Sequence, residues 1–452
     1  MTNIVSHHID RFQGESRVPG DKSVSHRALM FGALSVGETR ITGLLEGDDV
    51  LATVLAMRRL GAEVTRLDDG TWQVFGCGIG GLASPDDVID MGNSGTGVRL
   101  LMGVIAGQPV TAVLTGDASL RARPMERIMT PLREMGVAFA AAEGGRLPLS
   151  MTGPADLMPI DYPSPVASAQ IKSAVLLAGL AAPGETTVIE AIATRDHTER
   201  LLRHFGAEVR TATEAAGAQR ITVVGQPELT GCAVRVPADI SSAAFPLVAA
   251  LIASEGELRL PAVGTNPLRA GLLETLTEMG ADITRANATV AAGEPIADLM
   301  VRASKLRGVT VPAGRAASMI DEYPILAMAA AVAEGTTHMA GLAELRVKES
   351  DRLALIVTGL KACNVDVEET EDSLTVHGTG APPAGGATIA SHHDHRIAMS
   401  FLVLGTVTAA PIRVTSAETI STSFPGFQDL MNGLGADMRI EDDDKQDQGD
   451  SA

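Results

Sequence analysis

A short pattern recurs six times along the 452-residue chain and limits what it can fold into. In each copy an amphipathic, helix-like stretch ends in Gly, or once in Asn. Ala, Val or a similar residue follows, and then an alternating segment typical of a strand. Consecutive copies lie 75, 70, 74, 84 and 71 residues apart, at Gly61, Gly136, Gly206, Gly280, Asn364 and Gly435.

Helix termination explains this pattern. The residue just past a helix end often takes the left-handed conformation, which Gly adopts without strain. Asn tolerates that conformation next best, and Asn364 occupies the fifth copy. Helix–Gly–strand junctions are common in α/β proteins, but six copies in near-regular register indicate a repeat. The spacing exceeds that of solenoid repeats, so we expect six βα units grouped as two globular domains of three units each.

Composition excludes several classes of function. Aromatic residues make up only 3%, which disfavours a base-stacking surface for single-stranded nucleic acid and requires an aliphatic core. The net charge of −19 disfavours nucleic acid and anionic membranes as partners. The three cysteines lie far apart, which suits a reducing compartment rather than a disulfide framework or zinc site.

The ends and the apolar runs of the chain indicate where the protein works. The N-terminus lacks the apolar core of a signal peptide, and the longest apolar runs are far shorter than the roughly 20 residues of a membrane span. We therefore expect a cytoplasmic enzyme. Residues 441–452 are rich in acids and are predicted to form a disordered tail.

Four segments place polar residues where a helix is predicted to begin. In residues 19–27, Asp21 or Ser23 can cap the helix, and Lys22 and Arg27 beside the free N–H groups suit a phosphate or carboxylate. Taken alone, a capped surface helix explains this segment more simply. The other three segments are a Gly-rich loop (90–99), a polar loop (117–124) and the helix start at 168–173. Anion binding and ordinary turns or caps both remain open for them.

Acidic and basic residues gather in the last third of the chain. Asp321 precedes a long apolar helix, where it can be a helix cap or a catalytic base. Lys348 and Arg352 are four residues apart and are expected to share a helical face with Glu349, as a binding group or as solvent-exposed ion pairs. Residues 391–396 contain three His and one Asp, but consecutive residues make a poor metal site.

Together these segments closely resemble the EPSP synthase family of enolpyruvyl transferases, and in detail its second sequence class. The resemblance runs from about Val18 to Leu434 and is carried by GDKSVSHR, GNSGTG, GDASLRARP, SAQIKSA, MIDEYP, RVKESDR, DHRIAM and SFPGF. The agreement of several motifs in order is far more specific than any one of them.

The resemblance implies a mixed α/β fold. Two domains would each contain three βαβαββ units with pseudo-threefold symmetry, an inside-out α/β barrel, and the active site would lie in the cleft between the domains. The first domain would comprise residues 1–19 and 238–440, and the second residues 20–237, with the tail at 441–452 outside both. This agrees with the sixfold repeat.

The resemblance also implies a reaction. The enzyme would transfer the enolpyruvyl group of phosphoenolpyruvate to the 5-hydroxyl of shikimate 3-phosphate, through a tetrahedral ketal phosphate, and release phosphate. This is a step of the shikimate pathway to chorismate and the aromatic amino acids. No metal or organic cofactor is implied, and a monomer is expected. The nearest alternative, UDP-N-acetylglucosamine 1-carboxyvinyltransferase, has Lys-Asn at the position of Lys22-Ser23 and a loop Cys that is missing between Asp117 and Arg127.

Site residues follow from the matching motifs. Those implied to contact shikimate 3-phosphate are Lys22, Ser23, Arg27, Ser168, Ala169, Gln170, Arg195, Asp321 and Lys348. Those implied to contact phosphoenolpyruvate are Lys22, Gly95, Arg123, Gln170, Arg352 and Arg396. Asp321 would be the base for the 5-hydroxyl, Glu349 the proton carrier at the methylene carbon, and Lys22 a further catalytic residue.

The chain departs from the better-known first class at three positions. Glu344 stands at the position of a common Asn, His197 at that of a Tyr and Thr422 at that of a Lys, which weakens the case for a phosphate clamp near Thr422. Glyphosate, the family's herbicide, occupies the phosphoenolpyruvate site and is blocked by a small side chain at the position of Gly95. Since Gly is present, we expect the enzyme to be sensitive to glyphosate.

Overall fold

The computed structural model describes residues 2–214 and 217–441. The chain divides into two compact units, which are described separately. Unit 1 is formed by Met1–Pro19, Ala238–Thr289 and Ile296–Ala452, and unit 2 by Gly20–Pro237 and Val290–Pro295. Glu441, the first residue of the predicted tail, instead pairs with Asn3 in a sheet, and residues 442–452 lie outside the described part of the chain.

Each unit contains three sheets of four strands, all built to one plan. Counted across the sheet, the first strand runs parallel to its neighbour, and this second strand runs antiparallel to the third. The fourth strand forms the opposite edge of the sheet. The sheets of unit 2 are β14 (Ala233–Arg235), β3 (Val36–Thr42), β5 (Trp72–Cys77), β4 (Glu63–Arg66); β6 (Ile89–Asp90), β7 (Thr111–Thr115), β9 (Arg146–Thr152), β8 (Ala138–Ala142); and β10 (Asp161–Pro163), β11 (Glu185–Glu190), β13 (Gln219–Val224), β12 (Val209–Thr213).

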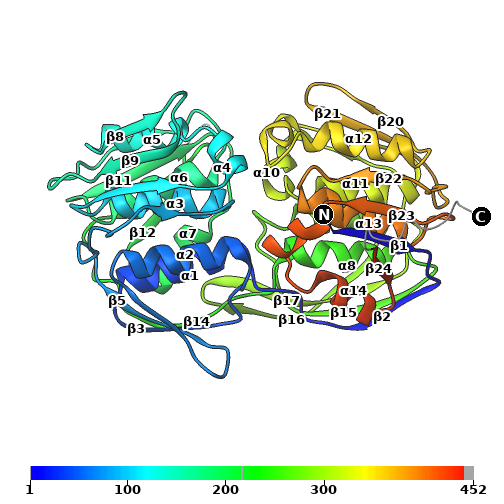
Figure 1. Cartoon of the computed structure of the whole chain (residues 1–452), viewed down its shortest axis with the longest axis horizontal. Coiled ribbons are helices and arrows are strands. Elements are labelled where there is room, and N and C mark those ends of the chain that lie inside the picture. Colours follow the sequence, from blue (N-terminus) through cyan, green and yellow to red (C-terminus); the bar gives the residue numbers. More distant parts are fainter. Residues whose placement is uncertain (1, 215–216, 442–452) are drawn as a thin grey trace, which may run out of the picture. The chain divides into compact units, whose positions relative to one another are not determined.

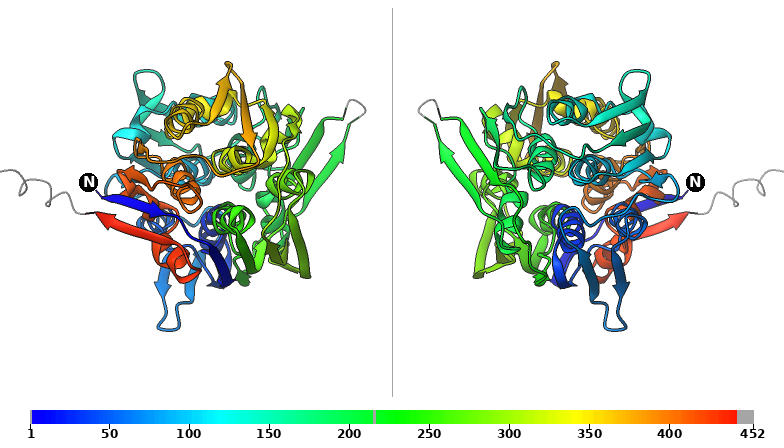
Figure 2. Two further views of the ribbon diagram at one scale, coloured as in Figure 1. Left: turned by 90° about the vertical axis from the view of Figure 1, so that its right-hand side faces the viewer. Right: turned by 90° about the vertical axis from the view of Figure 1, so that its left-hand side faces the viewer.

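Unit 1 repeats the same plan with strands from both ends of the chain. Its sheets are β2 (Arg11–Glu15), β15 (Glu255–Gly264), β17 (Glu294–Arg302), β16 (Asp282–Ala291); β18 (Thr310–Val311), β19 (Glu334–Ala340), β21 (Ser373–Thr379), β20 (Asp366–Glu369); and β22 (Thr388–Ala390), β23 (Ile412–Thr415), β1 (Asn3–His7), β24 (Asp437–Glu441). The N-terminal strand β1 thus lies between β23 and the C-terminal strand β24, and Figure 2 shows the blue and red strands side by side.

Two kinds of helix accompany the sheets. One kind is buried along most of its length, and these helices pack against one another inside each unit (Figure 1): α1 (Lys22–Leu34), α3 (Gly95–Ala106) and α6 (Ala169–Gly179) in unit 2, and α8 (Ile240–Ile252), α11 (Tyr323–Val332) and α13 (His395–Gly405) in unit 1. The other kind buries only part of its surface: α2 (Asp48–Arg59), α5 (Glu126–Glu134), α7 (His197–His204), α9 (Gly271–Glu278), α12 (Arg352–Ala362) and α14 (Phe427–Gly433).

Shorter helices complete the described part of the chain. They are α4 (Ala118–Ala122), α10 (Ala316–Met319) and the 3₁₀ turns η1 (Ala313–Arg315), η2 (Ala343–Val347) and η3 (Ala417–Thr422). Along the chain the order is strand, buried helix, strand, second helix and hairpin, as in β6, α3, β7, α5, β8 and β9. The expected mixed α/β fold built from βαβαββ units is confirmed. None of the described helices is long and apolar enough to cross a membrane.

The repeated helix ends have the predicted geometry. In all six copies the residue after the helix has a positive φ, from +62° at Asn364 to +108° at Gly435. In the first copy the Gly61 amide donates to the Arg58 carbonyl and the Ala62 amide to the Met57 carbonyl, which is the Schellman arrangement. The same two bonds close the other five helices, and an edge strand follows each one.

The cores are aliphatic, as the composition requires. Each unit has one continuous core of mainly Ala, Leu, Val, Ile and Met, centred on its three buried helices. The few aromatic rings pack edge to face, with ring centroids 5.8 Å apart for Phe31 and Phe205 in unit 2 and 6.0 Å apart for Phe245 and Phe427 in unit 1. Cys77, Cys232 and Cys363 are free thiols.

Candidate active site

In unit 2 several of the expected residues lie at the N-terminal ends of buried helices, namely Lys22, Ser23, Gly95, Ser168, Ala169 and Gln170. Asp21, and not Ser23, caps α1, because its Oδ1 accepts a hydrogen bond from the Val24 amide at 2.8 Å. This cap starts the helix at Lys22. The first turn of a helix carries unpaired N–H groups and a partial positive charge, so side chains placed there are well sited to bind an anion.

Arg27 is buried and held by three helices. Its Nε donates to Thr198 Oγ1 at 2.7 Å, its Nη2 to Ser173 Oγ at 2.7 Å and its Nη1 to the Ser23 carbonyl at 2.9 Å. Burial lowers the pKa of Arg27 to about 10, and Glu199 opposes that shift. The guanidinium therefore stays charged near neutral pH and has a fixed orientation.

Lys22 pairs with a residue that the sequence analysis missed. Its Nζ lies 2.9 Å from Asp49 Oδ2, and both side chains are mostly buried. Asp49 belongs to the acidic first turn of α2. A pair of acids at a helix start was the available signal, but it is also typical of any stabilised helix.

A glycine makes room for two arginines at the start of α3. Ser94 caps this helix, which begins at Gly95, within the segment predicted as a Gly-rich loop (90–99). A Cβ at Gly95 would lie 2.9 Å from Arg123 Nη1 and 3.2 Å from Arg99 Nη1. The expected Arg123 and the unexpected Arg99 therefore both approach Gly95 closely.

Arg123 leaves its helix just before Pro124, because a residue that precedes proline favours an extended conformation. It ends α4 in an extended conformation, with φ −83° and ψ 134°. Its Nη2 donates to Asn93 Oδ1 at 2.8 Å and to Ser119 Oγ at 3.0 Å. The Gly-rich loop and the polar loop are thus joined by this one guanidinium.

Gln170 connects α6 to α3. Its Oε1 accepts from Arg99 Nη1 at 3.2 Å and its Nε2 donates to Thr96 Oγ1 at 3.2 Å. Ser168 caps α6 by accepting from the Ile171 amide at 3.4 Å, and Ala169 is the first helical residue. Arg99 Nη1 also donates to the Gly95 carbonyl at 3.4 Å, so Arg99 joins Gln170 to Gly95, while Ser23 is joined to Arg27.

The segment before α7 holds the last expected residue of unit 2. Arg195 lies in the loop between β11 and α7. His197, which stands where the first class has a Tyr, is buried, and its Nδ1 lies 2.8 Å from Glu294 Oε1. This His is held by a protein carboxylate, a contact that sequence reasoning did not foresee.

In unit 1, Asp321 is not a helix cap. Glu322 occupies the N-cap position of α11 and makes no side-chain cap bond, so the cap interpretation of Asp321 is wrong. Instead Asp321 Oδ1 lies 3.3 Å from Arg352 Nη1 and 3.6 Å from Lys348 Nζ. The carboxylate is thus oriented by two cations.

Arg352 is fully buried among three carboxylates. Besides Asp321, its Nε lies 2.8 Å from Asp394 Oδ2 and its Nη2 lies 2.5 Å from Glu349 Oε2. Burial opposes the charge, but Asp394, Glu349 and Asp321 outweigh it and raise the pKa of Arg352 above its ordinary value. The expected residues Asp321, Lys348, Glu349 and Arg352 are therefore brought together.

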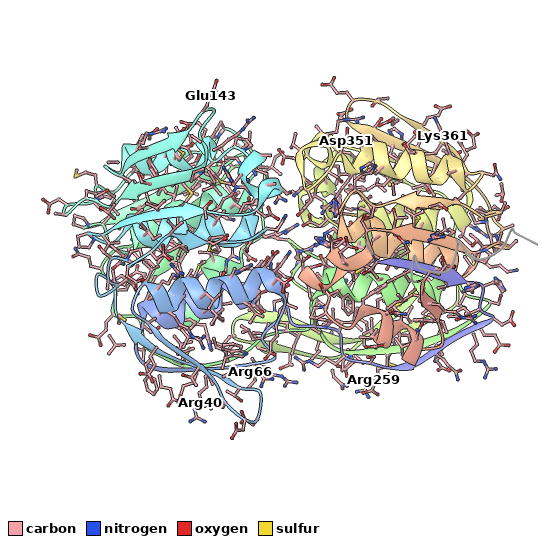
Figure 3. The ribbon with its side chains drawn as sticks, viewed as in Figure 1. Arg40, Arg66, Glu143, Arg259, Asp351 and Lys361 are labelled. Carbon is pink, nitrogen blue, oxygen red and sulfur yellow. The ribbon has the colours of Figure 1, made fainter. Side chains whose placement is uncertain are left out.

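The expected helical face of Lys348 and Arg352 is a wrong prediction. Residues 348–351 are not helical, and α12 begins only at Arg352 because Asp351 Oδ1 accepts from the Ala354 amide at 3.0 Å. Figure 3 labels Asp351 and Lys361 near the two ends of this helix. The alternative of solvent-exposed ion pairs is also wrong for Arg352, which is 0% exposed.

The segment with three His positions two arginines. Asp394 caps α13 by accepting from the Arg396 amide at 2.9 Å, and its other oxygen accepts from Arg352 and from Ser350 Oγ. Burial opposes ionisation of Asp394, but Arg352 outweighs it and the pKa is lowered. Arg396 Nη1 donates to the Asp321 carbonyl at 3.1 Å.

A second buried carboxylate, Glu322, also escaped the sequence analysis. Arg269 Nη2 donates to Glu322 Oε1 at 2.8 Å, Ser241 contacts both side chains, and Arg396 Nη1 lies 3.5 Å from the same oxygen. Arg269 lowers the pKa of Glu322 against the effect of burial. Its only sequence signal was its place beside Asp321.

The expected site residues of the two units offer different chemical groups. Unit 2 offers cations and helix N-termini, which bind phosphate and carboxylate groups. Unit 1 offers cations together with Asp321 and Glu349, which can take up or give a proton. These groups suit a reaction of anionic substrates that needs proton transfer.

Comparisons with known proteins agree on one family. A family model described as EPSP synthase (3-phosphoshikimate 1-carboxyvinyltransferase) matches residues 7–431. A curated 3-phosphoshikimate 1-carboxyvinyltransferase from Paramagnetospirillum magneticum is 64% identical over 94% of this chain and 95% of its own length. The protein of the same name from Rhodospirillum rubrum is 58% identical over 96% of this chain and 97% of its own length.

Solved structures support the fold. EPSP synthase from Acinetobacter baumannii is 46% identical, with a TM-score of 0.88 over 98% of this chain and all of that one. The enolpyruvyl transferase NikO from Streptomyces tendae is 20% identical, with a TM-score of 0.75 over 97% of this chain and 99% of that one, which is a likeness of fold alone.

Proposed function

The chain belongs to the EPSP synthase family, and from that premise we propose how its residues share the work of the reaction. The enzyme transfers the enolpyruvyl group of phosphoenolpyruvate to the 5-hydroxyl of shikimate 3-phosphate and releases phosphate, a step of the shikimate pathway. Relatives at 58–64% identity over nearly the whole chain do not favour the UDP-N-acetylglucosamine enzyme.

Shikimate 3-phosphate is bound by residues of both units in this proposal. Unit 2 supplies the helix starts and cations that receive its phosphate and hydroxyl groups: Lys22, Ser23, Arg27, Ser168, Ala169, Gln170 and Arg195. Unit 1 supplies Asp321 and Lys348. The charge of Arg27 and its fixed orientation support this assignment, because a preorganised guanidinium binds phosphate in two-point contact.

Phosphoenolpyruvate is bound by a second set of cations. Gly95 and Arg123 of unit 2 act with Lys22 and Gln170, and Arg352 and Arg396 of unit 1 complete the set. The close approach of Arg123 Nη1 to Gly95 supports the first part, since the start of α3 and a guanidinium then face the same space. The burial of Arg352 among carboxylates supports the second, because it fixes the guanidinium before the substrate arrives.

Addition comes first. The 5-hydroxyl oxygen forms a bond to C2 of phosphoenolpyruvate while its proton passes to Asp321, and Glu349 gives a proton to the methylene carbon C3. The product is the tetrahedral ketal phosphate. Lys22 supplies positive charge to the phosphate group.

Elimination then reverses the proton movement at carbon. C3 returns a proton to Glu349, the bond from C2 to the phosphate oxygen breaks, and the proton held by Asp321 is available to the leaving phosphate. General acid–base steps of this kind contribute about 10²–10⁴-fold in rate. No step calls on a metal or organic cofactor.

The same function implies a domain organisation, a cellular compartment and an oligomeric state for the chain. The two domains comprise residues 1–19 with 238–440 and residues 20–237, close to the two compact units. The enzyme works as a cytoplasmic monomer. Its partners are the two small anionic substrates.

One observation carries the catalytic assignment: Asp321 Oδ1 is bracketed by Lys348 and Arg352 and serves no cap. The experiment is a phosphate-release assay with both substrates, with UDP-N-acetylglucosamine as the control acceptor. Asp321→Asn should lower kcat by about 10²-fold or more. Asp351→Asn is the matched control, because Asn can still cap α12 and activity should stay within a few-fold. Full phosphate release by Asp321→Asn would show that the base is wrongly assigned.

A further inference from the structure

Lys172 is a buried cation that no step of the reaction uses. It lies on α6, two residues after Gln170, and is only 1% exposed. Its Nζ lies 2.9 Å from Glu190 Oε2 and 2.9 Å from Glu199 Oε1, and it donates to the Thr194 carbonyl at 3.2 Å. A buried ammonium is tolerated only when it is paired and hydrogen bonded, and all three contacts of Lys172 reach segments outside α6.

Glu190 extends these contacts into the loop that carries Arg195. It is the last residue of β11, and its Oε2 accepts from the Thr194 amide at 3.3 Å while its Oε1 accepts from the Thr194 hydroxyl. Thr194 is thus held at its amide, its carbonyl and its side chain by two buried residues. The backbone that enters Arg195 is therefore fixed on α6 and β11.

Glu199 extends the contacts in the other direction, to Arg27. It lies in the first turn of α7, beside Thr198, whose hydroxyl accepts from Arg27 Nε. Ser173, which follows Lys172 on α6, accepts from Arg27 Nη2. The ion cluster of Lys172, Glu190 and Glu199 therefore adjoins both hydroxyls that orient this guanidinium.

The electrostatics keep the Lys172 ammonium charged. Burial alone would lower the pKa of Lys172, but Glu199 and Glu190 outweigh it and raise the pKa. Glu199 also opposes the lowering of the pKa of Arg27 by burial, so the cluster and this guanidinium interact. The cluster is thus an ionic clamp between α6, β11 and α7, and not an isolated pair.

We propose that Lys172 is a positioning residue for the phosphate group of shikimate 3-phosphate, acting through Arg195 and Arg27. The inference rests on the proposed function, where those two arginines are assigned to that substrate. Lys172 itself touches no substrate. It sets the positions of the Thr194–Arg195 backbone and of the first turn of α7, and a misplacement of the arginines by about 1 Å is enough to weaken their contacts strongly.

The first test compares two ligands that differ only in the phosphate. Lys172→Met keeps the length of the side chain and removes its charge. Calorimetry should show shikimate 3-phosphate binding at least about tenfold more weakly to this variant, with the affinity for shikimate unchanged. An equal loss for both ligands would mean a merely structural role and would overturn the proposal.

A double-mutant cycle separates this inference from the proposed function. Arg195→Ala should weaken binding of shikimate 3-phosphate, and Lys172→Met should weaken it less in the Arg195→Ala background than in the unaltered protein, because only the part of its effect that passes through Arg27 remains. If Arg195→Ala leaves the affinity unchanged, the site assignment itself fails. If Arg195→Ala weakens binding but Lys172→Met does not, only the positioning role fails.

Two further variants guard against a loss of folding. Thr194→Ala removes one bond to Glu190 and leaves the ion cluster intact, so it should fold and lower the affinity for shikimate 3-phosphate several-fold, with no change for shikimate. Leu176→Ala is the matched control on the same helix, since Leu176 is fully buried and makes no part of the cluster. It should lower the melting temperature and leave both affinities unchanged. Unchanged affinity for shikimate 3-phosphate in Thr194→Ala would contradict the proposal.

Discussion

At the scale of the residue, the arginines are oriented before any substrate binds. Arg27 is held by two hydroxyls and a carbonyl, and burial lowers its pKa to about 10. Arg352 is held by carboxylates, which raise its pKa. Both sets of contacts keep a buried guanidinium charged and restrict its rotation. Little free energy is therefore needed to reorganise the site when an anion binds.

Gly95 offers the first prediction at this scale. The Cβ of Gly95→Ala would lie 2.9 Å from Arg123 Nη1, so the guanidinium must move away. We expect the KM for phosphoenolpyruvate to rise about tenfold and inhibition by glyphosate to weaken. The unaltered enzyme should be inhibited by glyphosate when phosphoenolpyruvate is low.

Steady-state phosphate release with and without glyphosate checks this prediction. Gly314→Ala is the control, because a Cβ there meets no atom within 4 Å. Unchanged turnover of the unaltered enzyme at millimolar glyphosate would contradict the predicted sensitivity.

His26 gives a prediction about pH. It is fully buried, its Nδ1 lies 2.8 Å from Thr53 Oγ1, and burial lowers its pKa to about 3. The folded state therefore binds fewer protons than the unfolded state below pH 6.5, and stability falls as the pH decreases from about 6.5 towards about 3. The slope is about 1.4 kcal/mol per pH unit for this one group.

Replacing the imidazole tests this slope. Between pH 7 and pH 5 the unaltered protein should lose about 2 kcal/mol more free energy of unfolding than His26→Gln, measured by urea unfolding. His204→Gln, which changes an exposed ring, should follow the unaltered protein. Parallel losses in the unaltered protein and His26→Gln would refute the assignment.

At the scale of the element, each unit uses its helices for two tasks. The apolar helices such as α1, α3 and α6 are buried along their length and present their N-termini, where Lys22, Gly95 and Ala169 begin them. The second helices end in a left-handed residue that turns the chain into an edge strand. The buried helices and the left-handed ends of the second helices both recur with the sequence repeat. The helix N-termini that carry site residues therefore recur with it as well.

The helix ends give a prediction with a matched control. A Cβ at Gly206 has its nearest atom at 4.0 Å, so Gly206→Ala costs only the strain of a positive φ, about 1–2 kcal/mol. Gly433, the last residue of α14, has no neighbour within 4 Å and no positive φ, so Gly433→Ala should stabilise by about 0.4–1 kcal/mol. Urea unfolding measures both, and a loss in both variants would contradict the conformational explanation.

At the scale of the whole molecule, an acidic chain contains two sets of cations. The net charge of −19 describes the average of the chain and not its site. The fold also brings together residues far apart in the sequence, because β1 lies between β23 and β24 in the last sheet of unit 1. The two termini of the described chain therefore depend on one another.

The position of β1 gives the last prediction. Because Asn3 pairs with Glu441 in antiparallel register, a short turn can join residue 441 to residue 3. A circular permutant that begins at Arg11 and ends at Asp10 should fold and release phosphate.

Deletion of residues 2–10 should leave β23 and β24 without β1 as their partner and lower the urea concentration at the midpoint of unfolding. A deletion variant as stable as the full chain would disprove the role of β1.

Most of the fold could be predicted from the sequence, but only part of the site. The repeat and its left-handed ends are local, because a helix C-terminus is closed by residues within six positions of one another. Motif order indicated Asp321, Glu349 and Arg352. The missed residues Asp49, Arg99, Arg269 and Asp394 act through partners far away in sequence, and no local pattern reports such contacts.

The sequence by itself determined the repeat, the fold class, the family and the anionic character of the substrates. Tertiary structure decided what the buried charged side chains do: Asp394 holds Arg352, and Lys172 contacts two carboxylates on separate segments. The physical reason is the separation in sequence between the residues that interact. Helix ends and turns depend on neighbouring residues, whereas burial and charge pairing depend on how distant elements pack, so the same charged residue can be a solvated surface group or a buried cation.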